Sequence, residues 1–284
     1  MQETAKVLVA GASGYLGGYV TKELLRRGIN TKILVRNRNK INIHNEKLEI
    51  IEAEVTKPET ISDLLADVDV VISTVGITRQ KDGLRYMNVD YQANANLLSE
   101  AQRANVKRFI YVSVLNGEQL RKLKICEAKE RFRGELRSSG LDYTIIRSNE
   151  FFSDMADFLK MAKGGKVYLF GDGSLKLNPI HGEDLAKVVV DSISQSPKEI
   201  NIGGPDLLTQ NEIAELALKA YAKPIRIIHL PNWIRKGSLW LVRTFTDSKT
   251  YGPIEFFLTT MAMDMNTPQY GEIRLETFFY ENAT

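Results

Sequence analysis

The first half of the chain alternates short runs of β-branched and apolar residues with longer segments of helical periodicity. This alternation is typical of parallel strands joined by crossover helices. Long helices are predicted from Tyr15 to Gly28, where glycine follows two arginines, and over residues 88–104, while Pro58 fits the first turn of another. The six predicted strands cover residues 6–10, 31–35, 48–52, 68–74, 109–114 and 143–147. The pattern therefore predicts an α/β fold with a Rossmann-type, doubly wound parallel sheet.

The pattern changes after residue 147, where large apolar residues become closely spaced and glycine-rich turns follow. A helix over residues 184–193 and a strand over 199–202 are predicted to return the chain to the sheet. Thr209 and Glu212 form a capping box for a helix through Tyr221. We therefore predict a core over residues 1–150 that is rejoined by about 180–203. Residues 151–179 and 204–284 would form a smaller, discontinuous substrate or lid lobe.

Composition narrows the classes of function. The chain is 43% hydrophobic and 26% charged with a net charge of +3, so nothing in it requires a nucleic-acid partner. The single cysteine, Cys126, cannot form an internal disulfide, and no cysteine and histidine spacing suits a metal site, so we expect a helix residue there and no bound metal. Without a signal peptide or a membrane-spanning apolar run, the expected localisation is cytoplasmic.

A glycine-rich turn opens the first predicted helix, with the spacing G-x-x-G-x-x-G directly after a strand. Unpaired N–H groups and the helix dipole favour an anion there, and glycine allows the main chain to approach it closely. The turn therefore predicts a site for the pyrophosphate of a dinucleotide, with an ordinary turn between strand and helix as the alternative. The residues expected to bind it are Gly11, Ala12, Ser13, Gly14, Tyr15, Leu16 and Gly17.

The end of the second predicted strand indicates which dinucleotide binds. An acidic residue at this place accepts from a ribose hydroxyl, whereas arginine accommodates a 2′-phosphate. The chain has Arg36 there and Arg38 beyond it, with no carboxylate before Glu46. A guanidinium matches a phosphate through paired, charge-assisted hydrogen bonds, so NADP(H) is predicted in preference to NAD(H). A solvated basic loop is the alternative.

Four stretches resemble the atypical short-chain dehydrogenase/reductase superfamily and its NmrA-like branch. They are VAGASGYLG at residues 9–17, DVVIS at 69–73, VKRFIYVS at 106–113 and SGLDYTIIR at 139–147. The resemblance spans most of the chain. It implies a Rossmann fold that binds NAD(P)(H), with Thr74, Val75 and Gly76 passing beside the adenine-side ribose.

The same resemblance implies candidate catalytic residues. Active members of the superfamily use a tyrosine four residues before a lysine to protonate the substrate oxygen; this chain has Lys129, but Ile125 stands at the tyrosine position. Isoflavone reductase-like relatives also lack the tyrosine and are thought to use the lysine for proton transfer or to hold the nicotinamide ribose. Ser113 occupies the position of the superfamily's catalytic or substrate-orienting serine, although a strand-end hydroxyl that caps a turn is an equal alternative.

The residues themselves support an inward-facing Lys129. Ile125, Lys129, Phe132 and Leu136 stand at helical spacing on one face, which is expected to face the core. Beside a cofactor, desolvation and the cationic nicotinamide would lower the pKa of Lys129 and ease proton exchange near neutrality. A lysine whose stem covers apolar surface while its head stays solvated is the alternative.

Residues after the sixth predicted strand are candidates for substrate contact. Asn149, Phe151 and Phe152 follow at the carboxyl edge of the sheet, where open α/β folds bind ligands, although core packing explains the two phenylalanines equally well. Further along, two tryptophans and several apolar residues accompany basic residues over 233–243. A packed lid helix is favoured for this segment over peripheral membrane or partner contact, because its charges do not define one clear face.

Two functions follow from these observations. Residues 126–136, 170–173 and 202–205 also resemble divinyl chlorophyllide reductases, which favours an NADPH-dependent reductase of a small, apolar or conjugated substrate. Ile125 instead favours a non-catalytic NADP(H)-binding sensor, or an assembly or accessory subunit of a redox complex. Fold analogy alone does not decide between them.

Overall fold

The computed structural model describes residues 5–77, 83–194 and 197–283. The chain forms two compact units, each built from two stretches of sequence. Unit 1 contains Met1–Arg147 and Leu185–Ile200, and unit 2 contains Ser148–Asp184 and Asn201–Thr284.

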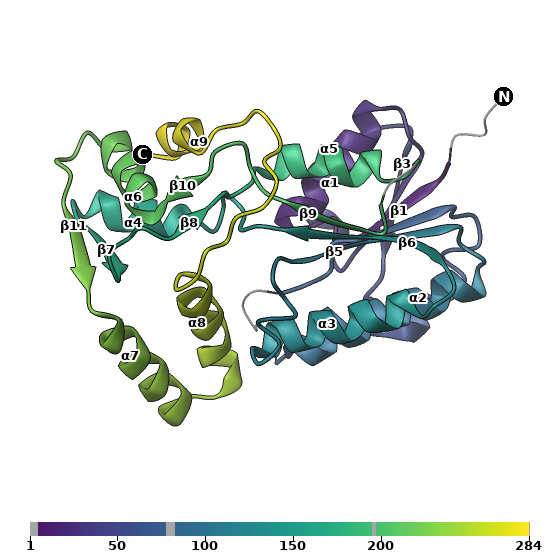
Figure 1. Cartoon of the computed structure of the whole chain (residues 1–284). Coiled ribbons are helices and arrows are strands. Elements are labelled where there is room, and N and C mark those ends of the chain that lie inside the picture. The colour runs from purple at the N-terminus through teal and green to yellow at the C-terminus, as the bar shows by residue number, and fades with distance from the viewer. Residues whose placement is uncertain (1–4, 78–82, 195–196, 284) are drawn as a thin grey trace. The chain divides into compact units, whose positions relative to one another are not determined.

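A seven-stranded sheet organises unit 1, with the strand order β3-β2-β1-β4-β5-β6-β9 (Figure 1). The paired strands from β3 to β5 are parallel, and the bonds from Ile145 N to Lys198 O and from Asn149 N to Ile202 O, both 2.9 Å, keep β6 and β9 parallel as well. The predicted doubly wound Rossmann-type sheet is therefore confirmed. The strands are β1 (Val7–Ala10), β2 (Thr31–Val35), β3 (Leu48–Glu52), β4 (Val70–Ser73), β5 (Arg108–Val114), β6 (Asp142–Ser148) and β9 (Glu199–Ile202).

Helices cover both faces of this sheet. Helices α1 (Tyr15–Arg26) and α5 (Gly182–Asp191) lie on one face, and α2 (Asn94–Arg103) and α3 (Lys124–Arg137) lie on the other (Figure 1). The first helix ends as predicted, since Gly28 has a φ of 71° just beyond it. Both faces of the sheet are thereby removed from water, which explains why its central strands carry continuous apolar runs.

The core of unit 1 lies between the sheet and α3. Every residue of β1, β2 and β4 is buried. The ring of Phe132 packs 5.9 Å from that of Phe109 and 4.7 Å from that of Tyr111, centroid to centroid. Ile125, Phe132 and Leu136 are buried on one face of α3, which confirms the predicted inward face of this helix.

Two predicted helices are interrupted. The helix expected from Pro58 is a single 3₁₀ turn, Pro58–Thr60, and Asp63 then takes a left-handed φ of 62° that an α-helix cannot contain. The helix expected over residues 88–104 begins as a π-helix, Met87–Ala93, before α2. Asn94 explains this change, since its side-chain amide donates to the carbonyls of Val89 and Asp90 at 3.3 and 3.0 Å.

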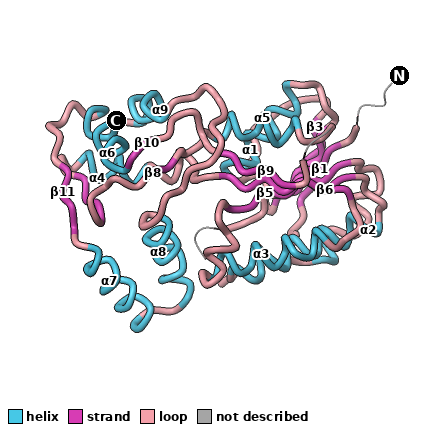
Figure 2. Tube along the Cα trace, viewed as in Figure 1, coloured by secondary structure: helices cyan, strands magenta, loops and turns pink. Residues whose placement is uncertain are grey.

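Unit 2 combines two small sheets with helices (Figure 2). One sheet pairs the parallel strands β7 (Val167–Phe170) and β11 (Ile227–Leu230), and the other pairs the antiparallel strands β8 (Lys176–Leu177) and β10 (Leu208–Thr209). The predicted capping box of Thr209 and Glu212 is present at the start of α6. The helices are α4 (Ala156–Lys163), α6 (Gln210–Ala220), α7 (Asn232–Phe245), α8 (Ser248–Thr260) and α9 (Leu275–Asn282).

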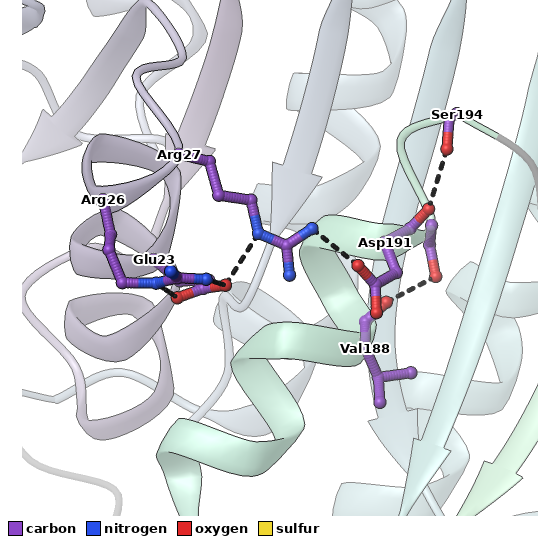
Figure 3. A network of polar contacts seen from close by, with 7 residues as sticks. Glu23, Arg26, Arg27, Val188, Asp191 and Ser194 are labelled. Atoms are coloured by element: carbon purple, nitrogen blue, oxygen red, sulfur yellow. Dashed lines mark hydrogen bonds and ion pairs between the residues drawn. The ribbon is translucent and has the colours of Figure 1, made fainter.

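A charged network joins α1 to α5 within unit 1 (Figure 3). Arg26 and Arg27 both donate to the carboxylate of Glu23 at 2.7 Å, and Arg27 also pairs with Asp191 at 2.6 Å. The Arg26 guanidinium, with Arg27 beside it, lowers the pKa of Glu23 to about 2, against the opposing effect of burial. Glu23 therefore stays ionised in the folded protein at almost any working pH.

We expect Glu23→Gln to lower the free energy of unfolding by about 1 kcal/mol at neutral pH, after allowing for screening of the exposed Arg26. The folded pKa lies below the ordinary value of 4.5, so this stabilisation is present above pH 4.5 and disappears as the pH falls towards 2. Urea titrations across this range measure the difference. Exposed Glu183→Gln is the control, and a loss that persists unchanged at low pH would contradict the electrostatic explanation.

Candidate functional site

The turn between β1 and α1 requires glycine at two positions. Gly11 has a φ of 88°, which side-chain-bearing residues rarely adopt, and its carbonyl accepts from Gly14 N at 2.9 Å. A Cβ atom added to Gly17 would lie 2.1 Å from that same carbonyl oxygen. The glycine spacing seen in the sequence therefore reflects a backbone that folds tightly on itself.

The same turn presents main-chain donors at the start of α1. The N-cap residue is Gly14, which has no side chain to satisfy the N–H groups of the first helical turn, and no acidic residue occupies that turn. Ala12 and Leu16 are buried and anchor the turn, while Ser13 and Gly14 are exposed. The arrangement suits an anion, because the helix dipole and the uncapped N–H groups attract negative charge.

The end of β4 lies directly against this turn. Thr74 bonds to the carbonyl of Ala10 through its N–H at 3.0 Å and through its hydroxyl at 3.1 Å. A Cβ atom at Gly11 would approach the Thr74 hydroxyl to 2.7 Å. Because the strand order reverses between β1 and β4, this contact marks the switch point where open α/β sheets bind ligands.

Asn94 fixes the chain after β4, a role that the sequence did not reveal. Its side-chain oxygen accepts from the Ser73 hydroxyl at 2.5 Å, and its amide donates to the carbonyl of Val75 at 3.2 Å. Asn94 is fully buried. No signal in the sequence singles it out, because the predicted helix over residues 88–104 contains several other polar residues.

Lys129 forms a buried ion pair with Asp90. Its ammonium nitrogen lies 2.9 Å from Asp90 Oδ1, and the side chains are 12% and 0% exposed. A Cβ atom at Gly76 would lie 2.8 Å from both charged atoms, so the pair rests against the main chain after β4. The structure thus brings Lys129 beside Gly76, two residues beyond Thr74, whose side chain lies against the glycine turn.

The structure gives Lys129 a charged neighbour, Asp90, that the expectation of a lowered pKa beside a cationic nicotinamide did not include. Burial, the largest single influence, would lower the pKa of Lys129, but the charge and hydrogen bond of Asp90 together with Tyr111 and Cys126 outweigh burial and raise the pKa above its ordinary value. Burial also raises the pKa of Asp90, although Lys129 counteracts that effect. Lys129 therefore provides a fixed positive charge and does not exchange its proton readily near neutrality.

No tyrosine stands four residues before Lys129, and Ser113 stays a candidate catalytic residue near the end of β5. Ile125 is buried in the core, and Tyr111, whose ring centre lies 5.9 Å from the Lys129 ammonium, is fully buried. Burial raises the pKa of Tyr111 to about 12. The hydroxyl of Ser113 is buried near the end of β5 and has no hydrogen-bond partner among the described residues.

Arg36 and Arg38 follow β2 and are both exposed. No carboxylate follows them in sequence before Glu46, but the parallel register pairs Val35 of β2 with Glu52 of β3. Glu52 accepts from the main-chain N–H of Arg38 at 3.2 Å. The fold thus brings an acidic residue to this strand end from the neighbouring strand, which sequence order alone could not show.

The three candidate substrate residues belong to unit 2 and make structural contacts there. The buried Asn149 donates to Asn178 at 2.8 Å and to the carbonyl of Met265. Phe152 is buried and packs 5.5 Å from His181 and 5.4 Å from Phe278, between ring centres. Phe151 pairs with Ile180 in an isolated β-bridge.

Glu150, between these residues, is a titratable group that sequence reasoning missed. Both of its carboxyl oxygens are buried and have no hydrogen-bond partner among the described residues. Burial raises the pKa of Glu150 to about 7. Unit 2 therefore carries a carboxyl group that changes charge near neutral pH.

In the described part of the chain, potential metal ligands do not cluster and the cysteine thiol is buried. Within that part, no group of three or more histidine, cysteine or acidic side chains is placed to hold a metal ion. Cys126 lies buried in α3 as a free thiol, and burial raises its pKa to about 12. Among the helices of residues 5–77, 83–194 and 197–283, none combines the length and apolar composition needed to cross a bilayer.

Comparison with known proteins identifies the family. A family model described as NAD(P)H-binding matches residues 11–196, which include the glycine turn, β4 and Lys129. The chain belongs to this NAD(P)H-binding family. The predicted place in the atypical short-chain dehydrogenase/reductase superfamily is thereby confirmed.

Relatives of this NAD(P)H-binding protein have different roles. A chloroplastic divinyl chlorophyllide a 8-vinyl-reductase from Oryza sativa subsp. indica is 30% identical, over 96% of this chain and 77% of the relative. The photosystem II assembly factor Ycf39 of Synechocystis sp. is 26% identical, over 85% and 74%. The family thus includes proteins named as a reductase and as an assembly factor.

Solved structures confirm the fold of the NAD(P)H-binding chain. An Escherichia coli NADPH-dependent quinone oxidoreductase, solved with NADPH, is similar with a TM-score of 0.71 and 18% identity, over 97% of this chain and 99% of that one. A Staphylococcus aureus nucleoside-diphosphate-sugar epimerase gives a TM-score of 0.76 at 16% identity, over 97% and 99%.

Two neighbouring glycines of α1 test the geometry of the turn. Gly17→Ala should lower the free energy of unfolding by at least ~2 kcal/mol, because its Cβ collides with the Gly11 carbonyl. Gly18→Ala is the matched control, since its Cβ would lie 3.7 Å from the nearest described atom, and should stabilise α1 by ~0.5–1 kcal/mol. Urea unfolding measures both changes, and equal effects would show that the turn is not constrained as described.

Proposed function

We propose that this chain is an NADPH-dependent reductase of a small, apolar or conjugated substrate. The observation that carries the proposal is the buried Lys129–Asp90 ion pair, which places a fixed positive charge beside the main chain after β4 at the switch point of the sheet. A buried ion pair is costly, so its presence at this position supports a role in chemistry.

The residues present fit a bound dinucleotide. The close-packed turn of Gly11, Gly14 and Gly17 would cradle the pyrophosphate on main-chain N–H groups, and Thr74 to Gly76 would pass beside a ribose. Arg36 and Arg38 are exposed at the end of β2, and we infer that Arg36 selects the 2′-phosphate of NADPH. Glu52 accepts from the main-chain N–H of Arg38 at the same strand end.

A bound NADPH would supply the hydride. Reduction of a conjugated double bond adds this hydride to one carbon and a proton to the other, and negative charge develops on the substrate between the two events. The Lys129 ammonium, kept protonated by Asp90, is suited to stabilise that charge or to hold a ribose hydroxyl. Since Ile125 replaces the usual tyrosine and Tyr111 is buried, the proton would come from water.

A second candidate is a non-catalytic NADP(H)-binding assembly factor. Ile125 favours it, because the tyrosine hydroxyl is missing from α3. The raised pKa of Lys129 also favours it, since a permanently charged lysine is a poor proton donor. Relatives named as photosystem II assembly factors support this candidate.

Absorbance of reduced nicotinamide separates the two candidates. The purified chain would be incubated with NADPH and a panel of quinones, enals and vinyl-bearing compounds, alongside affinity purification of the chain from its own cells. NADPH oxidation that depends on the added compound supports the reductase. Tight NADPH binding without oxidation of any compound, together with a stoichiometric protein partner, would replace it with the assembly role.

A variant set isolates the charge of Lys129. Lys129→Met should abolish turnover, but it also strands the Asp90 carboxylate and should cost about 3–5 kcal/mol of stability. The double variant Asp90→Asn/Lys129→Met removes both charges, so it should regain part of that stability while turnover falls at least ~100-fold.

Calorimetric titration should give the double variant an NADPH affinity within about tenfold of that of the unmodified protein. Asp90→Asn alone keeps the ammonium and should retain more turnover than the double variant. A double variant that turns over at the original rate would refute a catalytic role for Lys129.

Arg36 tests the choice of cofactor. Arg36→Glu should weaken NADPH binding by at least ~10-fold and leave NADH binding equal or stronger, because the carboxylate repels a phosphate and accepts from a ribose hydroxyl. Arg85→Glu, a substitution of the same charge outside this strand end, is the control. Unchanged NADPH preference in Arg36→Glu would assign Arg36 to a solvated basic loop.

A further inference from the structure

Helix α7 exposes large apolar side chains that the proposed function does not use. Trp233, Trp240 and Phe245 are 72%, 63% and 75% exposed. None of the residues of α7 is buried, although the helix packs against α8 in unit 2 (Figure 1). The packed lid helix favoured from the sequence therefore does not account for its outer face.

The exposed side chains form ordered stripes. Trp233 and Trp240 stand seven residues apart and share one stripe, and Lys236 and Arg243, also seven apart, form a basic stripe beside it. Phe245 extends the apolar surface on the side of the tryptophans that faces away from the basic stripe. The half-buried residues Arg235 and Val242, seven apart, occupy the opposite face, whereas Ile234 lies on the same side of the helix as Phe245.

The segment that contains α7 carries more basic than acidic residues. Residues 231–250 contain four basic residues, Arg235, Lys236, Arg243 and Lys249, and a single acidic one, Asp247. Arg243 pairs with Glu255 of α8 at 2.8 Å, which leaves Lys236 as an exposed basic group of the stripe. The charges of residues 233–243 do not define one clear face in the sequence because Arg235 lies on the other side of the helix.

We propose that α7 is a membrane-surface helix that lies in the plane of an anionic lipid bilayer. Tryptophan side chains favour the headgroup level, where an apolar ring and a polar N–H are both satisfied, and Lys236 would meet lipid phosphates. The proposal stands apart from the reductase function and does not depend on it.

Both tryptophans of the chain are on α7, so intrinsic tryptophan fluorescence reports on this helix alone. With vesicles of phosphatidylcholine and phosphatidylglycerol we expect a blue shift, protection from acrylamide quenching, and co-flotation of the protein. Pure phosphatidylcholine vesicles should give much weaker binding, and high salt should reverse the binding to anionic vesicles.

Variants that keep both tryptophans test the surface. Lys236→Glu should weaken partitioning to anionic vesicles by about tenfold or more, and Leu241→Ser/Phe245→Ser should weaken it on both lipid types. The matched controls are Lys160→Glu, an exposed lysine of α4, and Ile225→Ser, which is 53% exposed outside α7. The side chains changed in all four variants face solvent, so circular dichroism should show an unchanged fold.

Three results would overturn the proposal. One is tryptophan emission and flotation that do not respond to anionic vesicles. Another is equal loss of binding in Lys236→Glu and Lys160→Glu, which would indicate net charge alone. The third is a lipid-free dimer in sedimentation that Leu241→Ser/Phe245→Ser dissociates, which would assign the face to a second copy. NADPH binding, measured separately, is expected to be unaffected in every variant.

Discussion

The structure around the candidate site depends on how closely the Gly11 carbonyl is approached by its neighbours. The Gly11 carbonyl oxygen accepts a hydrogen bond from Gly14 N, and a Cβ atom added to Gly17 would collide with it. A Cβ atom added to Gly11 itself would collide with Thr74. These contacts draw the start of α1 onto the carboxyl ends of β1 and β4. The helix N-terminus and the switch point of the sheet thereby coincide, which is the geometry that a dinucleotide requires.

The polar residues that hold the chain around this turn come from segments distant in the sequence. Asn94 holds the chain after β4 through Ser73 and Val75, and Asp90 holds Lys129. Both belong to or adjoin a π-helical segment, a feature that often marks functional sites. The buried Lys129–Asp90 ion pair stabilises the fold no more than apolar residues of similar size would. Packing alone therefore does not explain why the fold contains it.

Features that depend on residues close in sequence could be predicted, whereas contacts between distant segments could not. Strands β2, β3 and β9, the capping box at Thr209 and the inward face of α3 were predictable, because each depends on residues close in sequence. Partners from other elements were not. Glu52 reaches Arg38 only through strand register, and Asp90 reverses the expected pKa shift of Lys129 only because two helices pack together.

Glu150 extends the same reasoning to unit 2. Its pKa is raised from an ordinary value of 4.5 to about 7, so its ionisation favours the unfolded chain at every pH above 4.5, and most fully above 7. Neighbouring Asn149 is satisfied by Asn178 and Met265, which shows that this segment can saturate its polar groups. The uncompensated carboxyl therefore stands out as a cost to stability, as does the Lys129 pair.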